Sequence, residues 1–180
     1  APGRHRLTIR VDNRMIYNLS TVTHAYGPET QTRWNGLIGN LTLTAVPTTS
    51  IRSLAAYPAG DRRSVRIVMV TTNAGATTAS VGVQYRLLPE SGDSTLSEAQ
   101  LNFSCPPGIT TNETTLAFTT PAQSWDEFHT ARYRLHAALT NSDGKRDEAD
   151  IKFGFRQVER VGKEIHVNGR RIFLRGTLDC

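Results

Sequence analysis

The stretch FGFRQVERVGKEIHVNGRRIFLRG, residues 153–176, decides the interpretation of this chain. Its Asn168-Gly169 pair is a strong hairpin signal, because both residues tolerate the positive φ angles of a type I′ turn. We therefore predict a β-hairpin with strands from Ile165 to Val167 and from Ile172 to Leu174. Upstream, Phe153-Gly154-Phe155-Arg156 closes a run of alternating apolar and polar residues, which is typical of the end of a strand.

Working outward toward the N-terminus, short runs with strand periodicity recur from residue 48 to residue 153, with turn signals between them. The composition is rich in Thr, Ser, Val and Ile, which favours many short strands over a helical bundle. We predict an all-β fold, an immunoglobulin-like β-sandwich of about seven strands. The predicted strands cover residues 50–57, 64–73, 79–88, 98–104, 113–119, 131–140 and 147–153.

The segment before the sandwich has a less regular pattern. Residues 4–11 alternate, with Leu7, Ile9 and Val11 on one face, and this predicts a half-buried strand. Residues 14–33 show no periodicity and are interpreted as a long loop. A further strand is expected from Leu37 to Val46.

Composition argues against several classes of function. The net charge of +5 is spread along predicted strands, and no zinc spacing or recognition helix accompanies it, so nucleic-acid binding is not expected. No apolar run approaches the roughly 20 residues of a membrane span. Cys105 and Cys180 have no metal or redox spacing, and the five histidines show no ligand pair, so neither a metal nor a cofactor is predicted.

No catalytic residue is predicted within the chain. The acidic clusters, such as Glu90 with Asp93 and Asp126 with Glu127, fall in turns or at alternating strand positions, where solvated side chains are the ordinary case. There is no Gly-x-Ser-x-Gly elbow for a hydroxyl nucleophile.

The motifs named above together resemble a segment of glycoside hydrolase family 2, the family of β-galactosidases, β-mannosidases and β-glucuronidases. In that family a Phe-Gly-Phe-Arg turn ends an immunoglobulin-like domain, and Asn-Gly followed by Phe-Leu-Arg-Gly opens the catalytic barrel. Trp125 followed by Arg132-Tyr133-Arg134-Leu135 resembles the family's entry into the sixth strand, although the usual Pro and Leu are absent. Trp34-Asn35-Gly36 with the following strand looks like the end of the family's jelly-roll domain.

This resemblance implies a domain arrangement. Residues 1–47 would be the C-terminal remnant of a jelly-roll sugar-binding domain, and residues 48–153 the immunoglobulin-like sandwich. Residues 154–180 would be a linker and hairpin leading to a TIM barrel that the chain does not contain. The first residues have no apolar segment of a signal peptide and are interpreted as an internal start.

The resemblance also implies a function. The chain would be a non-catalytic spacer and docking region of a retaining, β-galactosidase-like enzyme that hydrolyses β-linked O-glycosides with two barrel glutamates. Its partners would be the carbohydrate substrate, bound through the parent enzyme, and the barrel and jelly roll of the same polypeptide, with homo-oligomer contacts as a further role. Thr177-Leu178-Asp179-Cys180 departs from the Asn and His that many relatives carry there, so the identity of the sugar that the parent enzyme cleaves stays undecided. The parent is expected to be an exported bacterial enzyme, periplasmic or secreted.

Four residues are candidates for substrate binding in the parent enzyme. Gln31, Trp34 and Asn35 lie in a loop that, by the resemblance, reaches over the barrel mouth, where an indole face and amides suit a sugar. The alternative is that Trp34 anchors a domain core. Arg175 would lie at the end of the first barrel strand, where a guanidinium can orient a carboxylate or a hydroxyl.

Two other functions remain open. A free-standing carbohydrate-binding or adhesion module would bind sugar through an aromatic platform, for which Trp34 and Trp125 are the main candidates. A purely structural interaction domain would bind no sugar and precede no barrel.

Overall fold

The computed structural model describes Arg4, residues 6–12 and residues 36–177. The chain divides into two compact units, one made of Ala1–Thr44 with Arg175–Cys180 and the other of Ala45–Leu174. Every strand of the described residues belongs to the second unit, and no helix occurs among them. The prediction of an all-β fold is confirmed.

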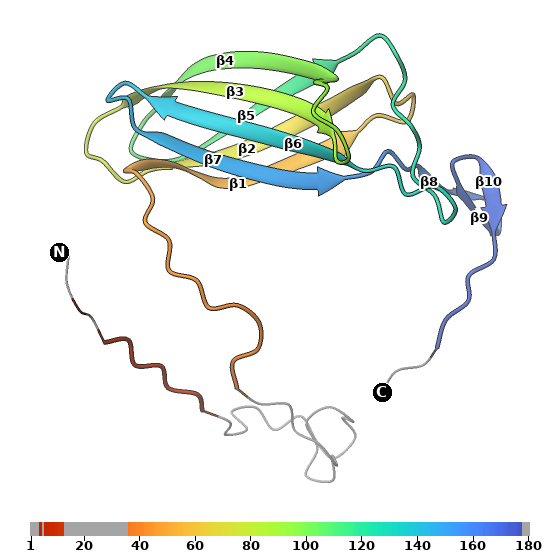
Figure 1. Cartoon of the computed structure of the whole chain (residues 1–180), viewed down its shortest axis with the longest axis horizontal. Coiled ribbons are helices and arrows are strands. Elements are labelled where there is room, and N and C mark those ends of the chain that lie inside the picture. The colour runs from red at the N-terminus through yellow and green to blue at the C-terminus, as the bar shows by residue number, and fades with distance from the viewer. Residues whose placement is uncertain (1–3, 5, 13–35, 178–180) are drawn as a thin grey trace. The chain divides into compact units, whose positions relative to one another are not determined.

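The second unit contains a sandwich of two antiparallel sheets (Figure 1). One sheet has the order β1-β2-β5 and the other the order β4-β3-β6-β7. The strands are β1 Thr49–Pro58, β2 Ser64–Asn73, β3 Ala79–Pro89, β4 Ser97–Cys105, β5 Gly108–Ala117, β6 Tyr133–Asn141 and β7 Arg146–Phe153. This is an immunoglobulin-like arrangement in which β4 pairs with β3, whereas the fourth strand of a constant-type domain joins the opposite sheet.

The sandwich core follows from the period-two alternation of its central strands. Each of β2, β3 and β6 buries every second side chain against the facing sheet. The fully buried members include Val65, Ile67 and Met69 of β2, Val81, Val83, Tyr85 and Leu87 of β3, and Leu135, Ala137 and Leu139 of β6.

Tyr85 is the largest of these side chains, and its hydroxyl donates a hydrogen bond to Met69 Sδ at 3.5 Å. Burial raises the pKa of this phenol to about 12, because the charged form loses its hydration.

The predicted strands of the sandwich agree with the structure, with one displaced start. The fifth strand was expected over residues 113–119, but β5 begins directly after the turn, at Gly108. Gly108 has a φ of 104°, so the chain reverses there and Ile109 already pairs with Thr72. The start of β5 is rich in threonine and has no alternation of apolar and polar residues, so hydrophobic periodicity does not predict a strand there.

A third sheet follows the sandwich, with the order β10-β9-β8. It consists of β8 Val158–Val161, β9 Glu164–Val167 and β10 Arg170–Ile172, and is called the ribbon below. The Asn168-Gly169 hairpin is confirmed, with φ angles of 52° and 76° at its two central residues. The predicted second strand from Ile172 to Leu174 is shifted, because the two-residue loop brings Arg170 directly opposite Val167.

The first unit differs from expectation where it is described. Residues 6–12 and 36–44 are irregular, and so are Ala45 and Val46 at the start of the second unit, so the predicted strands at 4–11 and 37–46 are not formed there. Leu7 and Leu43, which those strands were to bury, are 80% and 97% exposed. A strand requires a hydrogen-bonding neighbour, and the described residues supply none for these segments.

Candidate functional site

The end of the sandwich nearest the ribbon is closed by aromatic side chains. Phe155 is buried, and its ring meets the rings of Tyr133 and Phe118 edge-on, at centroid distances of 5.1 and 5.9 Å. Phe153 lies 5.6 Å from Phe155. The Tyr133 hydroxyl accepts a hydrogen bond from the Gln123 amide at 2.8 Å, as in the tyrosine corner of immunoglobulin-like domains. The two phenylalanines of the Phe-Gly-Phe-Arg motif are therefore anchors of this end.

The glycine between them is required by Trp125. A Cβ added at Gly154 would lie 2.8 Å from Trp125 Cβ and 3.0 Å from its Cγ, so the tryptophan occupies the space of the missing side chain. The Trp125 amide donates to the Phe155 carbonyl at 2.8 Å. The Arg156 guanidinium lies 4.6 Å from the centre of the Trp125 ring, in a cation–π contact.

Asn168 fastens the ribbon to this end of the sandwich. Its side-chain amide donates to the Trp125 carbonyl at 3.0 Å, and its side-chain oxygen accepts from the Gln157 amide at 3.0 Å. Its own backbone amide donates to the Gln157 carbonyl at 2.9 Å. The hairpin asparagine thus serves both the turn and the contact with the sandwich.

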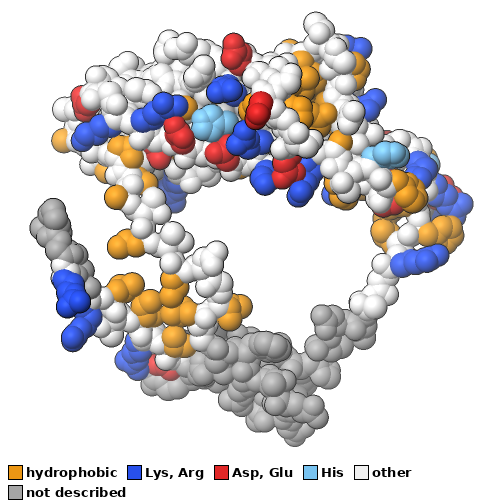
Figure 2. Space-filling view, in the orientation of Figure 1, with side chains coloured by type: hydrophobic (Ala, Val, Ile, Leu, Met, Phe, Trp, Pro, Cys, Tyr) orange, Lys and Arg blue, Asp and Glu red, His pale blue; other side chains and the backbone are white. Residues whose placement is uncertain are grey.

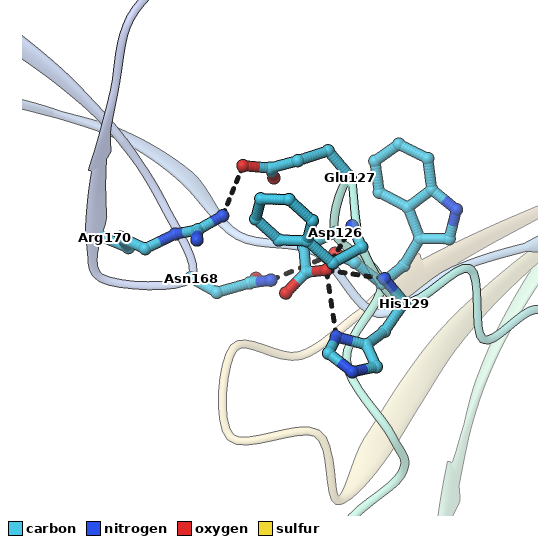
Figure 3. Close-up of polar contacts among 7 residues, drawn as sticks. Asp126, Glu127, His129, Asn168 and Arg170 are labelled. Carbon is cyan, nitrogen blue, oxygen red and sulfur yellow. Dashed lines mark hydrogen bonds and ion pairs between the residues drawn. The ribbon is translucent and has the colours of Figure 1, made fainter.

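Arg170 makes a second attachment two residues further along (Figure 3). Its guanidinium pairs with the carboxylate of Glu127 and lies 4.9 Å from the centre of the Phe128 ring. Asn168 and Arg170 therefore hold the ribbon against the segment 125–129, and the two residues with that segment are called the latch below.

The turn inside the latch is fixed by Asp126. Its carboxylate accepts from the amides of Phe128 and His129 at 2.9 and 2.8 Å, and lies 3.3 Å from His129 Nδ1 (Figure 3). These amides, that of Phe128 first, lower the pKa of Asp126 because they stabilise the charged form. The acidic pair Asp126 and Glu127 thus has a structural role in turn and latch.

Arg156 lines two pockets at this junction. One, of about 280 Å³, is lined by residues that include Arg62, Ser124, Arg156 and Gln157. The other, also about 280 Å³, is lined by residues that include Trp125, Arg132 and the same Arg156.

Of the four predicted substrate-binding residues, the structure describes Arg175. Gln31, Trp34 and Asn35 lie outside the described residues. Arg175 is exposed and lies beyond β10, in the first compact unit. Its role as a substrate contact stays a prediction.

The latch itself was not predicted. Its signal in the sequence was a glycine between two phenylalanines, which indicates a close approach by another chain segment, but nothing identified Trp125 as that segment. The turn residue Asn168 was predicted for its backbone alone, and its side-chain contacts could not be read from the sequence.

The outer face of β6 and β7 carries charges of both signs (Figure 2). Glu90 bonds Arg132 Nε at 2.6 Å and Lys152 Nζ at 2.7 Å, and His136 lies 3.3 Å from Asp150. The hydrogen bond from Lys152, together with the two positive charges, lowers the pKa of Glu90. Such a mixed surface is typical of a solvated sheet face.

Within the described part of the chain, no group of three or more His, Cys, Asp and Glu side chains is arranged to hold a metal ion. A search of the same residues for a helix long and apolar enough to cross a membrane found none.

The chain spans about a fifth of the length of the solved structures that share its fold. A glycosyl hydrolase family 2 member from Bacteroides cellulosilyticus aligns with a TM-score of 0.64 and 18% identity, over 73% of this chain and 19% of that one. A β-glucuronidase from Bacteroides uniformis aligns with a TM-score of 0.62 and 17% identity, over 73% and 17%. A protein described as a putative β-galactosidase from Bacteroides fragilis gives 0.58 and 22%, over 71% and 20%.

A comparison with curated protein sequences gives no match. The family model described as "Glycosyl hydrolases family 2" matches residues 49–156, which run from the start of β1 through the arginine of the Phe-Gly-Phe-Arg motif. These residues make up more than half of the chain, and the chain belongs to glycosyl hydrolases family 2.

Proposed function

We propose that this chain is an accessory β-sandwich region of a glycoside hydrolase, and that it acts as a spacer and docking domain. The observation that carries the proposal is the latch. It joins the ribbon to the aromatic end of the sandwich by the Asn168 hydrogen bonds and the Arg170 ion pair, so that whatever follows the ribbon starts from a fixed position. Family membership and the one-fifth share of the solved relatives support the accessory role.

The parent enzyme hydrolyses β-linked O-glycosides by a retaining mechanism in this proposal, with β-galactosidase-like specificity. The support is the family match and the resemblance of the Asn168-Gly169 to Gly176 segment to the family's barrel entry. Among the solved relatives, some are named β-glucuronidases and one a putative β-galactosidase. Arg175 is proposed to contact the substrate or a catalytic carboxylate in that parent.

The spacer role is tested in the full-length gene product. Weakening the latch with Asn168→Ala and Arg170→Ala together should reduce kcat for a 4-nitrophenyl β-glycoside, because the barrel and the sandwich lose their fixed relation. Arg160→Ala, which removes the same charge from β8 outside the latch, is the matched control and should keep full activity. Equal kcat in both variants would contradict a docking role for the latch.

The specificity is tested with a panel of 4-nitrophenyl β-galactoside, β-glucuronide and β-mannoside. Preference for the galactoside is the expected result, and preference for the glucuronide would correct it. Proton NMR of the first product should show retention of the anomeric configuration.

The rival function, a free-standing carbohydrate-binding module, is tested with the 180-residue chain alone. Calorimetric titration with galactose, mannose and neutral β-linked oligosaccharides should give no binding heat if the chain is a spacer. Saturable binding would favour the rival.

A further inference from the structure

We propose that the pocket bounded by Arg62 and Arg156 is a binding site for a carboxylate. This site lies on the described unit itself, and the proposal does not depend on the glycosidase activity of a parent enzyme.

The pocket gathers positive charge without a built-in counter-charge. Arg62 comes from the β1–β2 loop and Arg156 follows the aromatic motif, yet both line the same volume of about 280 Å³. Within residues 36–177, no salt bridge joins either guanidinium to a carboxylate, and none of the residues that line the pocket is acidic. An anion bound in this pocket would be attracted by the positive charges of two arginines that have no carboxylate partner among the described residues.

The remaining lining suits a carboxylate. Ser124 offers a hydroxyl donor and Gln157 an amide, while the buried ring of Phe155 supplies an apolar wall. Gly60 lies close to the Gln157 side chain, since a Cβ there would be 3.1 Å from Gln157 Oε1. Guanidinium groups bind planar carboxylates through two parallel hydrogen bonds, and a second arginine adds charge at the same place.

The backbone of Arg62 is a second, independent observation. Its φ is 58°, in the left-handed region, which glycine and asparagine adopt at a lower energetic cost than arginine. Arg62 stabilises the loop through two backbone hydrogen bonds. Its amide donates to the Ala59 carbonyl at 3.0 Å, and its carbonyl accepts from the Ala122 amide at 2.8 Å. Glycine would make both hydrogen bonds with less strain, so folding does not require an arginine side chain here, and we infer that the side chain has another function.

The carboxylate has two possible sources, an acidic side chain of a neighbouring protein segment or a free small acid. The 180-residue chain is titrated with acetate and, separately, with the blocked tripeptide Gly-Glu-Gly, each at an ionic strength matched with sodium chloride, while amide shifts are followed by NMR. The expected result is saturable shifts at Gly60, Gln157 and their neighbours. Tighter binding of the tripeptide assigns the site to a protein side chain, and equal binding assigns it to a small acid.

The key variant is Arg62→Gly, which should weaken carboxylate binding about tenfold and unfold at the same temperature as the wild type or a higher one. Arg156→Gln should weaken binding similarly, while Arg160→Gln, a matched charge removal on β8, should leave it unchanged. Shifts that are absent, that chloride reproduces, or that survive Arg62→Gly would overturn the proposal.

Discussion

Replacing Gly154 with alanine tests whether Trp125 is held against the backbone of the Phe-Gly-Phe-Arg motif. The new Cβ would lie 2.8 Å from Trp125 Cβ, closer than real Cβ contacts, and 3.0 Å from Cγ. Both atoms are at the root of the indole, so rotation of the ring cannot relieve the clash. The backbone must shift, and with it the 2.8 Å hydrogen bond from the Trp125 amide to the Phe155 carbonyl.

Overpacking of this kind costs about 1–3 kcal/mol. The lower entropy of the unfolded alanine chain offsets about 0.4–1 kcal/mol of that. We therefore expect the free energy of unfolding to fall by about 1–2 kcal/mol, which at a urea m-value of about 2 kcal/mol per M lowers the midpoint by about 0.5–1 M.

The assay is urea unfolding of the 180-residue chain followed by far-UV circular dichroism. Gly92→Ala is the matched control, because a Cβ at Gly92 meets nothing within 4 Å and that glycine has no positive φ. The control should unfold within about 0.5 kcal/mol of the wild type. A Gly154→Ala midpoint equal to that of the control would refute the packing of Trp125 on Gly154.

Three further predictions concern the latch and the titrating groups. Asn168→Gly keeps the turn conformation but removes both side-chain hydrogen bonds, so it should destabilise the chain by about 1–2 kcal/mol in urea unfolding and speed hydrogen exchange at the Gln157 amide; exchange as slow as in the wild type would show that these bonds contribute little. Because the pKa of Glu90 is lowered in the folded state, its carboxylate contributes to stability in full above the unfolded pKa of 4.5, and this contribution is lost as the pH falls through the lower folded pKa. The difference in urea midpoint between the wild type and Glu90→Gln should therefore shrink on acidification. A difference that stays constant with pH would contradict this prediction. The pKa of about 12 for Tyr85 predicts the opposite dependence, because the unfolded phenol ionises near pH 10 and the folded one only near pH 12, so stability is lost as the pH rises between these values. Tyr85→Phe has no phenol to ionise, so its thermal midpoint should fall less than that of the wild type over this pH range.

The strands of the sandwich were predictable because each strand and each turn is specified by residues that are neighbours in the sequence. Strands β2, β3 and β6 alternate apolar and polar residues, and the turn residues between them are glycine, proline, asparagine and aspartate. The partner of each strand is not local, and so the pairing of β4 with β3 could not be read from its own residues. The early start of β5 was missed because its inward-facing positions include Thr110 and Asn112 in place of apolar side chains.

The ribbon shows the same division. Asn168-Gly169 specified the hairpin, since few other pairs adopt two positive φ angles. Strand β8 was missed because Val158 and Val161 are its only apolar residues and both are at least half exposed. The latch depends on Asn168 meeting Trp125 across 43 positions of sequence, a contact that only the folded chain creates.

The strand predicted at residues 4–11 shows the limit of periodicity. Its alternation is regular, but an extended segment becomes a strand only when another pairs with it, and the described residues contain no such neighbour. Periodicity therefore indicates which face a strand would bury, and leaves open whether the strand forms.

The contacts of the latch imply that the ribbon and the sandwich move as one body. The most direct test is ¹⁵N relaxation of the 180-residue chain, which compares the rotational correlation time of amides in β8–β10 with that of amides in β2, β3 and β6. We expect one common correlation time for both sets of amides in the wild type. A distinctly shorter correlation time for the ribbon would show that it reorients independently of the sandwich, and would contradict the claim.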